Sequence, residues 1–372
     1  MIEIVEQAEA IGLSEEQLLK ASLLLQDAVA NGQLMGAVMQ VARHGKALSV
    51  VSVGRREIDN ADVLVAQDTV FLIASITKPI VCAAVMKLIE DGRLCLNDKA
   101  ADYLPAFGNR QKECITLHHL LTHTSGLPDM LPDNQALRQA HQPLSVFVEK
   151  MNALDVLFEL GTKISYQSCG IAILSAIVER VEGCSMPEIL RTHFFDPLRM
   201  TDSSLGKLDR CAGRISEIMI PGGSDGGTAG TDWDWNSEFW HGFAAPWGGM
   251  FTTAEDLTTL CQMFLNGGRW NNVRVLGEAT VATMTRDQTC EMPNLPDGEK
   301  LRQRWGLGWR LQDANLYGDL VSARTFGHGG ATGTVAWMDP ESGLSFVLLT
   351  NQADAATVLR PRLSNVIASA VM

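Results

Sequence analysis

The chain has 372 residues, enough to bury a large core as one unit or as two coupled subdomains. Hydrophobic residues make up 46% and charged residues 20%, proportions typical of a globular protein. The formal net charge of −13 argues against binding to nucleic acid or to an anionic membrane surface.

The first residues, Met1 to Gln7, contain neither the basic region nor the apolar segment of a secretory signal. No run of about 18 apolar residues is present, so no membrane span is expected. The 8 cysteines have no metal-binding spacing and are expected to be reduced thiols. We therefore expect a cytoplasmic protein with no bound metal and no cofactor.

Apolar residues at helical or alternating spacing define the expected elements. They predict, in chain order, a helix ending near residue 33, a hairpin of 38–42 and 48–52, a helix beginning near residue 75, helices over 171–181 and 254–264, strands over 334–338 and 344–349, and a last helix over about 355–371. Strands at both ends of the chain favour one antiparallel sheet built from both ends.

The most informative stretch is Ser75-Ile76-Thr77-Lys78. Residues three apart share a helix face, so the Lys78 amine can reach the Ser75 hydroxyl. Pro79 is tolerated only in the first turn of a helix, so the helix should begin near Ser75. The free N–H groups at that helix N-terminus favour a developing oxyanion. The pair therefore indicates acyl transfer through a covalent serine ester.

The chain resembles the serine β-lactamase-like superfamily, which includes class C β-lactamases, DD-peptidases and family VIII-type carboxylesterases. The resemblance runs in order from about residue 35 to the C-terminus. It is carried, beyond the Ser-x-x-Lys tetrad, by Leu94–Asp98, Tyr103–Pro105, Ile115–Leu127, Glu159–Ser168, Asp196–Ser203, Trp247–Leu257 and His328–Gly330.

This resemblance implies an α/β (α+β) fold of the β-lactamase/transpeptidase type, with an antiparallel sheet flanked by helices and an inserted, mainly helical subdomain. Residues 1–372 would form a single catalytic domain. Its α/β subdomain would comprise about 1–75 plus about 300–372, and its helical subdomain about 76–300. The active site would lie between the two.

The resemblance also implies roles for individual residues. Ser75 would attack the acyl carbonyl, and either Lys78 or the Tyr166 phenolate would take its proton. Ser168, two positions after the tyrosine, would steady the lysine and the substrate. By position, the backbone N–H groups of Ser75 and Ala331 would form the oxyanion hole.

The third motif, His328-Gly329-Gly330, departs from the family pattern. Lactam-recognising members usually carry Lys-Thr-Gly or Lys-Ser-Gly here, which supply a permanent cation and a hydroxyl for the lactam carboxylate. His328 is only partly charged near neutral pH, and Gly329 has no hydroxyl. Gly329 and Gly330 still allow a substrate to run close to the strand. We expect poor binding of carboxylate-bearing lactams.

Other patterns are weaker candidates for a functional site. Ser224 lies in a G-x-S-x-G sequence but is followed by a poor helix start. His119 and His123 are four apart without a third ligand, so they are expected to be structural. Trp233, Trp235 and Trp240 lie in a polar stretch and are candidates for the wall of an apolar acyl pocket.

The sequence favours a serine hydrolase that forms an acyl-enzyme, with a carboxylesterase for small or medium acyl esters as the first interpretation. The alternatives are a β-lactamase or D-amino-acid amidase or peptidase, an acyltransferase that passes the acyl group to an alcohol, and a binding protein that keeps the fold without turnover. The expected partner is a small-molecule ester. The sequence leaves the oligomeric state open.

Overall fold

The computed structural model describes residues 2–220, 222 and 226–372, with the backbone alone for 353–356. Its strands are β1 (Glu3–Val5), β2 (Gly36–Arg43), β3 (Lys46–Leu48), β4 (Val51–Gly54), β5 (Phe71–Leu72), β6 (Ser204–Leu205), β7 (Met250–Thr252), β8 (Arg269–Trp270), β9 (Val273–Arg274), β10 (Arg304–Trp305), β11 (Arg310–Leu311), β12 (Phe326–Gly329), β13 (Val335–Asp339) and β14 (Leu344–Thr350).

The α-helices are α1 (Glu15–Ala30), α2 (Thr77–Glu90), α3 (Ala100–Tyr103), α4 (Leu117–Leu121), α5 (Asn134–Gln139), α6 (Leu144–Asn152), α7 (Cys169–Glu182), α8 (Met186–Leu190), α9 (Asp196–Leu198), α10 (Glu238–Phe243), α11 (Ala254–Leu265), α12 (Glu278–Thr285), α13 (Asp297–Arg302), α14 (Ala314–Tyr317) and α15 (Ala353–Ala368). Short 3-10 helices are η1 (Ala8–Ile11), η2 (Ala74–Ile76), η3 (Pro105–Phe107) and η5 (Asp209–Arg214), and η4 (Arg191–Phe195) is a π-helical turn.

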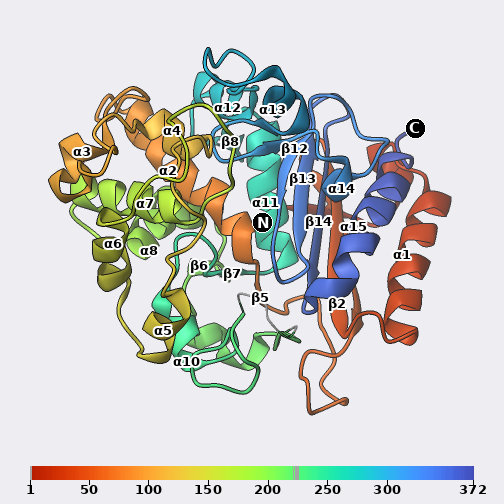
Figure 1. The fold of residues 1–372 in the computed structure, drawn as a ribbon. Helices are drawn as coiled ribbons and strands as arrows, with labels where there is room; N and C mark the ends of the chain where they lie inside the picture. The colour runs from red at the N-terminus through yellow and green to blue at the C-terminus, as the bar shows by residue number, and fades with distance from the viewer. Residues whose placement is uncertain (1, 221, 223–225) are drawn as a thin grey trace.

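The main sheet joins the two ends of the chain. Its strand order is β1-β3-β2-β14-β13-β12-β11-β10, with β4 also paired to β2. The N-terminal strand β2 pairs antiparallel with the C-terminal strand β14, so the red and blue ends of the chain lie side by side in Figure 1. The expected fold class is confirmed. One pair departs from it, because the three-residue edge strand β1 runs parallel to β3.

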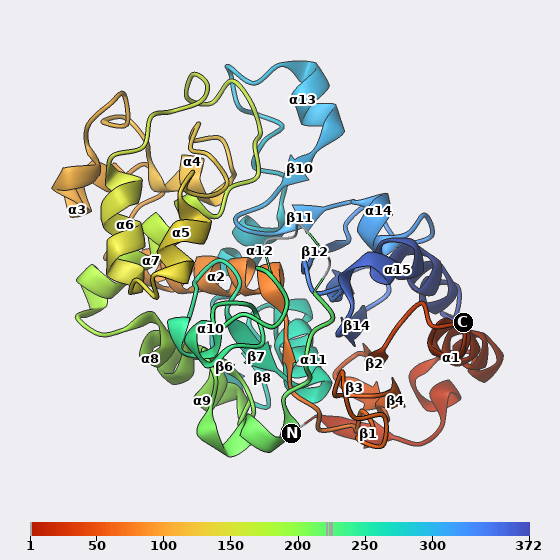
Figure 2. The ribbon, with the colours of Figure 1, turned by 60° about the horizontal axis from the view of Figure 1, so that its bottom comes forward.

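Alternation along the central strands explains the two layers of helices. Val38 and Ala42 of β2 belong to the core that contains α11, whereas Met39 and Val41 face the core shared with α1 and α15. Successive strand residues point to opposite faces, and both faces are covered here. Accordingly, α1 and α15 lie on one side of the sheet and α11 on the other (Figures 1 and 2).

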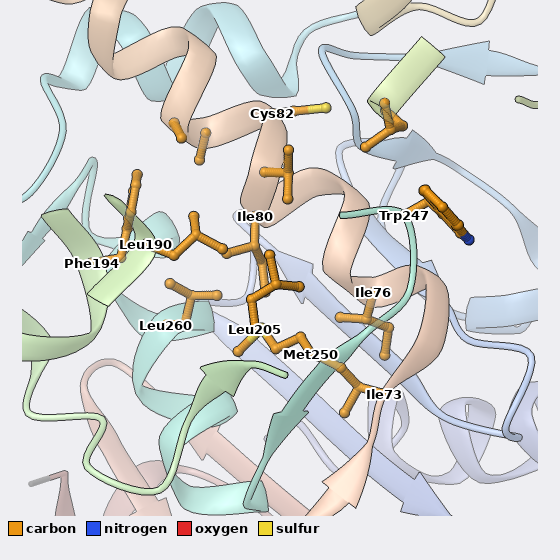
Figure 3. Close-up of a cluster of buried hydrophobic side chains, with 14 of the residues drawn as sticks. Ile73, Ile76, Ile80, Cys82, Leu190, Phe194, Leu205, Trp247, Met250 and Leu260 are labelled. Atoms are coloured by element: carbon orange, nitrogen blue, oxygen red, sulfur yellow. The ribbon is translucent and has the colours of Figure 1, made fainter. Parts of the chain in front are cut away.

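Helix α2 lies at the centre of the molecule, beside the sheet and against α7 of the helical part (Figure 2). Its sequence is apolar almost all round, as expected for a helix buried on every face. Figure 3 shows Ile76 and Ile80 among side chains of other elements, including Leu205 and Met250. Each large apolar side chain buried in this way contributes about 1.5–3 kcal/mol to folding. This packing fixes the helix that carries the Ser-x-x-Lys tetrad.

The strand predicted over 48–52 is divided at 49–50 into β3 and β4, each paired with β2. The remaining predicted elements are found with shifts of a few residues at their ends, which are the parts of an element least determined by local sequence. None of the eight cysteines forms a disulfide. Among the described residues, no helix is long and apolar enough to cross a membrane.

Candidate active site

Ser75 lies in the single 3-10 turn η2, immediately before α2. The residue before it, Ala74, has a φ of 45°, in the left-handed region that non-glycine residues rarely adopt. The Thr77 hydroxyl donates to the Ala74 carbonyl over 2.6 Å and holds this turn in place. Strained backbone of this kind is typical of functional sites. It presents the half-buried Ser75 side chain at the start of the helix.

Lys78 is fully buried, at 1% exposure, with its amine 3.0 Å from the Ser75 hydroxyl oxygen. The amine also donates to the backbone carbonyl of Trp247 over 2.8 Å. The structure therefore brings the two residues of the tetrad together, as their spacing predicts. The carbonyl of Trp247, which sequence reasoning did not single out, fixes the direction of the lysine side chain.

Tyr166 lies against the same amine, with its ring centroid 4.7 Å from the Lys78 nitrogen. Its phenol oxygen is buried and has no hydrogen-bond partner among the described residues. Burial raises the pKa of the Tyr166 phenol far above its usual value, and the nearby Ser75 hydroxyl opposes this only in part. The phenol is therefore protonated at neutral pH, which disfavours the phenolate considered from the sequence.

The imidazole rings of His123 and His328 pack against the Tyr166 ring. The rings of His123 and His328 lie 5.0 Å and 5.9 Å from the Tyr166 ring. Burial lowers the pKa of His328 to about 3 and that of His123 well below its usual value, with the Lys78 charge acting in the same direction. His328 is 3% exposed and its Nδ1 lies 2.7 Å from the Gly329 carbonyl. It is uncharged near neutral pH, whereas the sequence suggested partial charge.

Ser168 is placed by the turn that begins α7. Its backbone N–H donates to the Asp129 carboxylate over 2.7 Å, and its side chain is 4% exposed. Both residues line the cavity next to Ser75. Asp129 was not predicted as a site residue, because only the fold brings it to the start of α7.

The loop after β12 lies beside the segment that leads to Ser75. A Cβ atom at Gly330 would stand 2.3 Å from the Ile73 carbonyl oxygen, so only glycine permits this approach. The Thr334 hydroxyl donates to the same carbonyl over 3.1 Å. The next residue, Ala331, is exposed, and its N–H donates to no group in the described part of the chain. That N–H is available to a ligand.

A cavity of about 160 Å³ opens at Ser75. It is lined by Ala74, Ser75, Lys78, Asp129, Met130, Asn134, Arg138, Tyr166, Ser168, Trp235, Trp240, Trp247, Gly248 and Ala331. Of the predicted residues, the cavity brings together Ser75, Lys78, Tyr166, Ser168 and Ala331. It does not include His328, Gly329 or Gly330, although His328 packs against Tyr166 of its wall.

The tryptophan prediction identified part of this wall. Trp235 and Trp240 line the cavity, and Trp233 lies behind them against Arg138. Asn134 and Arg138 were missed, although they lie four residues apart on α5. Trp247 was also missed as a site residue, although its segment is one of those that resemble the family. Its carbonyl accepts a hydrogen bond from Lys78, and its side chain lines the cavity.

Of the other candidates, His119 does not line the cavity, whereas His123 packs against Tyr166 behind it. Ser224 lies outside the described residues. His119 is bonded to Thr116, with 2.7 Å between its Nδ1 and the hydroxyl oxygen. In the described ranges of the chain, no group of three or more His, Cys, Asp or Glu residues could hold a metal ion.

Known proteins with the same organisation identify the class. The Beta-lactamase family model matches residues 22–368. The N-acetylmuramyl-L-alanine amidase of Bacillus subtilis (strain 168) is 25% identical, over 93% of this chain and 83% of that protein. Two solved structures share the fold. EstCE1, a hydrolase with promiscuous acyltransferase activity, is 22% identical with a TM-score of 0.78, over 95% of this chain and 98% of that one. A family VIII carboxylesterase is 21% identical with a TM-score of 0.76, over 95% of this chain and 99% of that one.

The fold and the family match define a serine hydrolase of the β-lactamase fold. The chain belongs to the Beta-lactamase family.

Proposed function

We propose that this protein is a carboxylesterase that hydrolyses small or medium acyl esters through an acyl-enzyme at Ser75. The observation that carries the proposal is the state of His328. This residue is buried, uncharged and outside the cavity, so the third motif supplies no cation for a lactam carboxylate. A simple ester needs no such cation.

The geometry supports a division of labour among the catalytic residues. Lys78 first releases its own proton to solvent, and the neutral amine then takes the Ser75 proton across their 3.0 Å contact as the serine oxygen attacks the ester carbonyl. The N–H groups of Ser75 and Ala331 stabilise the oxyanion. The protonated Tyr166 phenol donates a hydrogen bond to the departing alkoxide and transfers its proton to it. The Lys78 ammonium then returns a proton to the phenol. Water then attacks the acyl-enzyme by the same steps and releases the acid.

The cavity supports a limited acyl size. Its volume of about 160 Å³ is close to that of an engineered protein cavity of about 150 Å³ that binds benzene. Tryptophan side chains form much of its wall, which favours an apolar acyl group. A butyryl group fits this space.

A second candidate is an amidase or peptidase for D-amino-acid substrates, which the amidase relative favours. An acyltransferase differs only in the acceptor, since an alcohol would replace water in the second step. A β-lactamase fits less well, because position 328 supplies no cation to the cavity wall. A binding protein without turnover also fits less well, because the contact between Ser75 and Lys78 is intact.

The test is release of p-nitrophenol from p-nitrophenyl butyrate by the wild type and by Ser75→Ala, with both proteins matched in thermal unfolding temperature. We expect turnover in the wild type and none in the variant. D-alanine p-nitroanilide and nitrocefin, run in parallel, test the amidase and β-lactamase alternatives. Equal activity in both proteins would reject Ser75 as nucleophile. Anilide turnover without ester turnover would replace the esterase with the amidase.

A further inference from the structure

The end of the cavity formed by α5 carries polar groups that the proposed ester chemistry does not use. Asn134 and Arg138 lie four residues apart, on the same face of this helix, and both line the cavity. Asn134 is 9% exposed and Arg138 is 2% exposed. Two buried polar side chains beside the tryptophans of this cavity call for an explanation.

The oxygen of the Asn134 amide is unsatisfied. This Oδ1 is buried without a hydrogen-bond partner among the described residues. Burying an amide in this way costs free energy that a bound ligand can recover. The amide can both accept and donate, so its best partner is a group that does both, such as a hydroxyl.

Arg138 contacts two tryptophans near the Asn134 amide, Trp233 and Trp240. Its guanidinium donates to the Trp233 carbonyl over 2.8 Å and lies 4.5 Å from the ring centroid of Trp240. These contacts hold the segment that contains Trp233, Trp235 and Trp240, called the tryptophan segment, against α5. Figure 1 shows α10, the helical part of that segment, beside α5.

The rest of the chamber sets the size and character of the ligand. Trp235, Trp240 and Trp247 supply flat apolar walls that suit a planar ring. The volume of about 160 Å³ admits a group of about the size of benzene.

We infer that Asn134 forms a subsite for the hydroxyl of a small hydroxylated acyl group, with a hydroxybenzoyl group as the best fit. The inference rests on the proposed function, since it assumes that the acyl carbon is held at Ser75. The hydroxyl donates to Asn134 Oδ1 and accepts from Nδ2, while the ring packs against the tryptophans.

The test uses aryl boronic acids, because they bind without turnover. The boron forms a bond to the Ser75 oxygen, the Ser75 proton passes to the Lys78 amine, and the boron becomes a tetrahedral anion. The aryl group then takes the place of the acyl group. Dissociation constants are measured by calorimetry for phenyl-, 3-hydroxyphenyl-, 4-hydroxyphenyl- and 4-carboxyphenylboronic acid. The proteins are the wild type, Asn134→Leu and Asn152→Leu. Asn152 is a matched control, since its Oδ1 is also buried without a partner but it does not line the cavity.

We expect one hydroxyphenyl isomer to bind the wild type about fivefold or more tighter than the phenyl compound, the gain of one hydrogen bond. That ratio should fall to about one in Asn134→Leu and persist in Asn152→Leu. The wild-type ratio is decisive even if the leucine variant does not fold. No hydroxyl preference, or tightest binding of the carboxyphenyl compound, overturns the subsite while leaving Ser75 chemistry intact. Absence of both boronate binding and ester hydrolysis would instead reject the proposed function, and the subsite with it.

Discussion

The guanidinium of Arg360 donates to the backbone carbonyl of Gly333 over 3.0 Å, and it also donates to the carbonyl of Gly330. These two carbonyls lie on either side of Ala331, whose N–H is the proposed second oxyanion donor. Arg360 comes from the C-terminal helix α15, and its burial lowers its pKa to about 10. The last helix of the chain therefore holds a loop of the candidate active site.

This contact predicts that Arg360→Met reduces kcat about tenfold or more with little change in KM, because a misplaced oxyanion donor weakens binding of the transition state rather than of the substrate. Arg360→Lys should recover part of the loss. The measurement is the kinetics of p-nitrophenyl butyrate hydrolysis beside thermal unfolding. A fall in activity that only follows the folded fraction would contradict a positioning role.

Tyr166→Phe should reduce kcat about 10²- to 10⁴-fold, the usual range for loss of a general acid or base. It should destabilise the protein less than the control below, because among the described residues only the nearby Ser75 hydroxyl acts on the buried phenol oxygen. Tyr317→Phe is the matched control, since that buried hydroxyl donates to the Arg310 carbonyl over 3.2 Å. The control should lose stability and keep its activity. Unchanged kcat in Tyr166→Phe would remove this residue from the mechanism.

Gly330→Ala should lower kcat/KM about 10²-fold, because the new Cβ atom would stand 2.3 Å from the Ile73 carbonyl and displace the segment leading to Ser75. Gly329→Ala is the control. Its Cβ atom would meet the flexible Leu316 side chain at 2.9 Å, which can move. Kinetics of both variants at equal folded fraction would decide. Similar losses in the two would show that the strand tolerates no side chain at either position.

Asp256 should make stability fall as pH rises through neutrality. Burial raises the pKa of its carboxyl to about 7, although it accepts hydrogen bonds from the Ser203 hydroxyl and the Asp202 N–H. An unfolded aspartate has a pKa of about 4, so the folded state binds more protons between pH 4 and 7. The stabilisation is full below that window and is lost above it.

The unfolding temperature of the wild type should therefore fall between pH 5 and pH 8. In Asp256→Asn this fall should be smaller by about 2 °C. Scanning calorimetry at several pH values measures this difference directly. If the Asp256 variant and the wild type show the same pH dependence, this carboxyl does not titrate in that range.

Local sequence was sufficient wherever the structure depends on neighbours along the chain. The spacing of Ser75 and Lys78, the apolar pattern of α2 and the tolerance for Pro79 in its first turn specified a serine beside a lysine at a helix start. Two short apolar runs likewise specified β13 and β14, which are buried along their whole length. The family resemblance then supplied the fold class, which depends on the order of all these segments.

The tertiary structure alone decided the character of the site. The pKa of His328 is set by burial behind Tyr166, and the direction of Lys78 by the Trp247 carbonyl, 169 positions away. Asn134 and Arg138 became candidates only when α5 met the tryptophan segment. Burial, charge and hydrogen-bond satisfaction depend on contacts between distant segments, and no local periodicity records them. The sequence by itself determined which groups can react, and the packing decided what surrounds them.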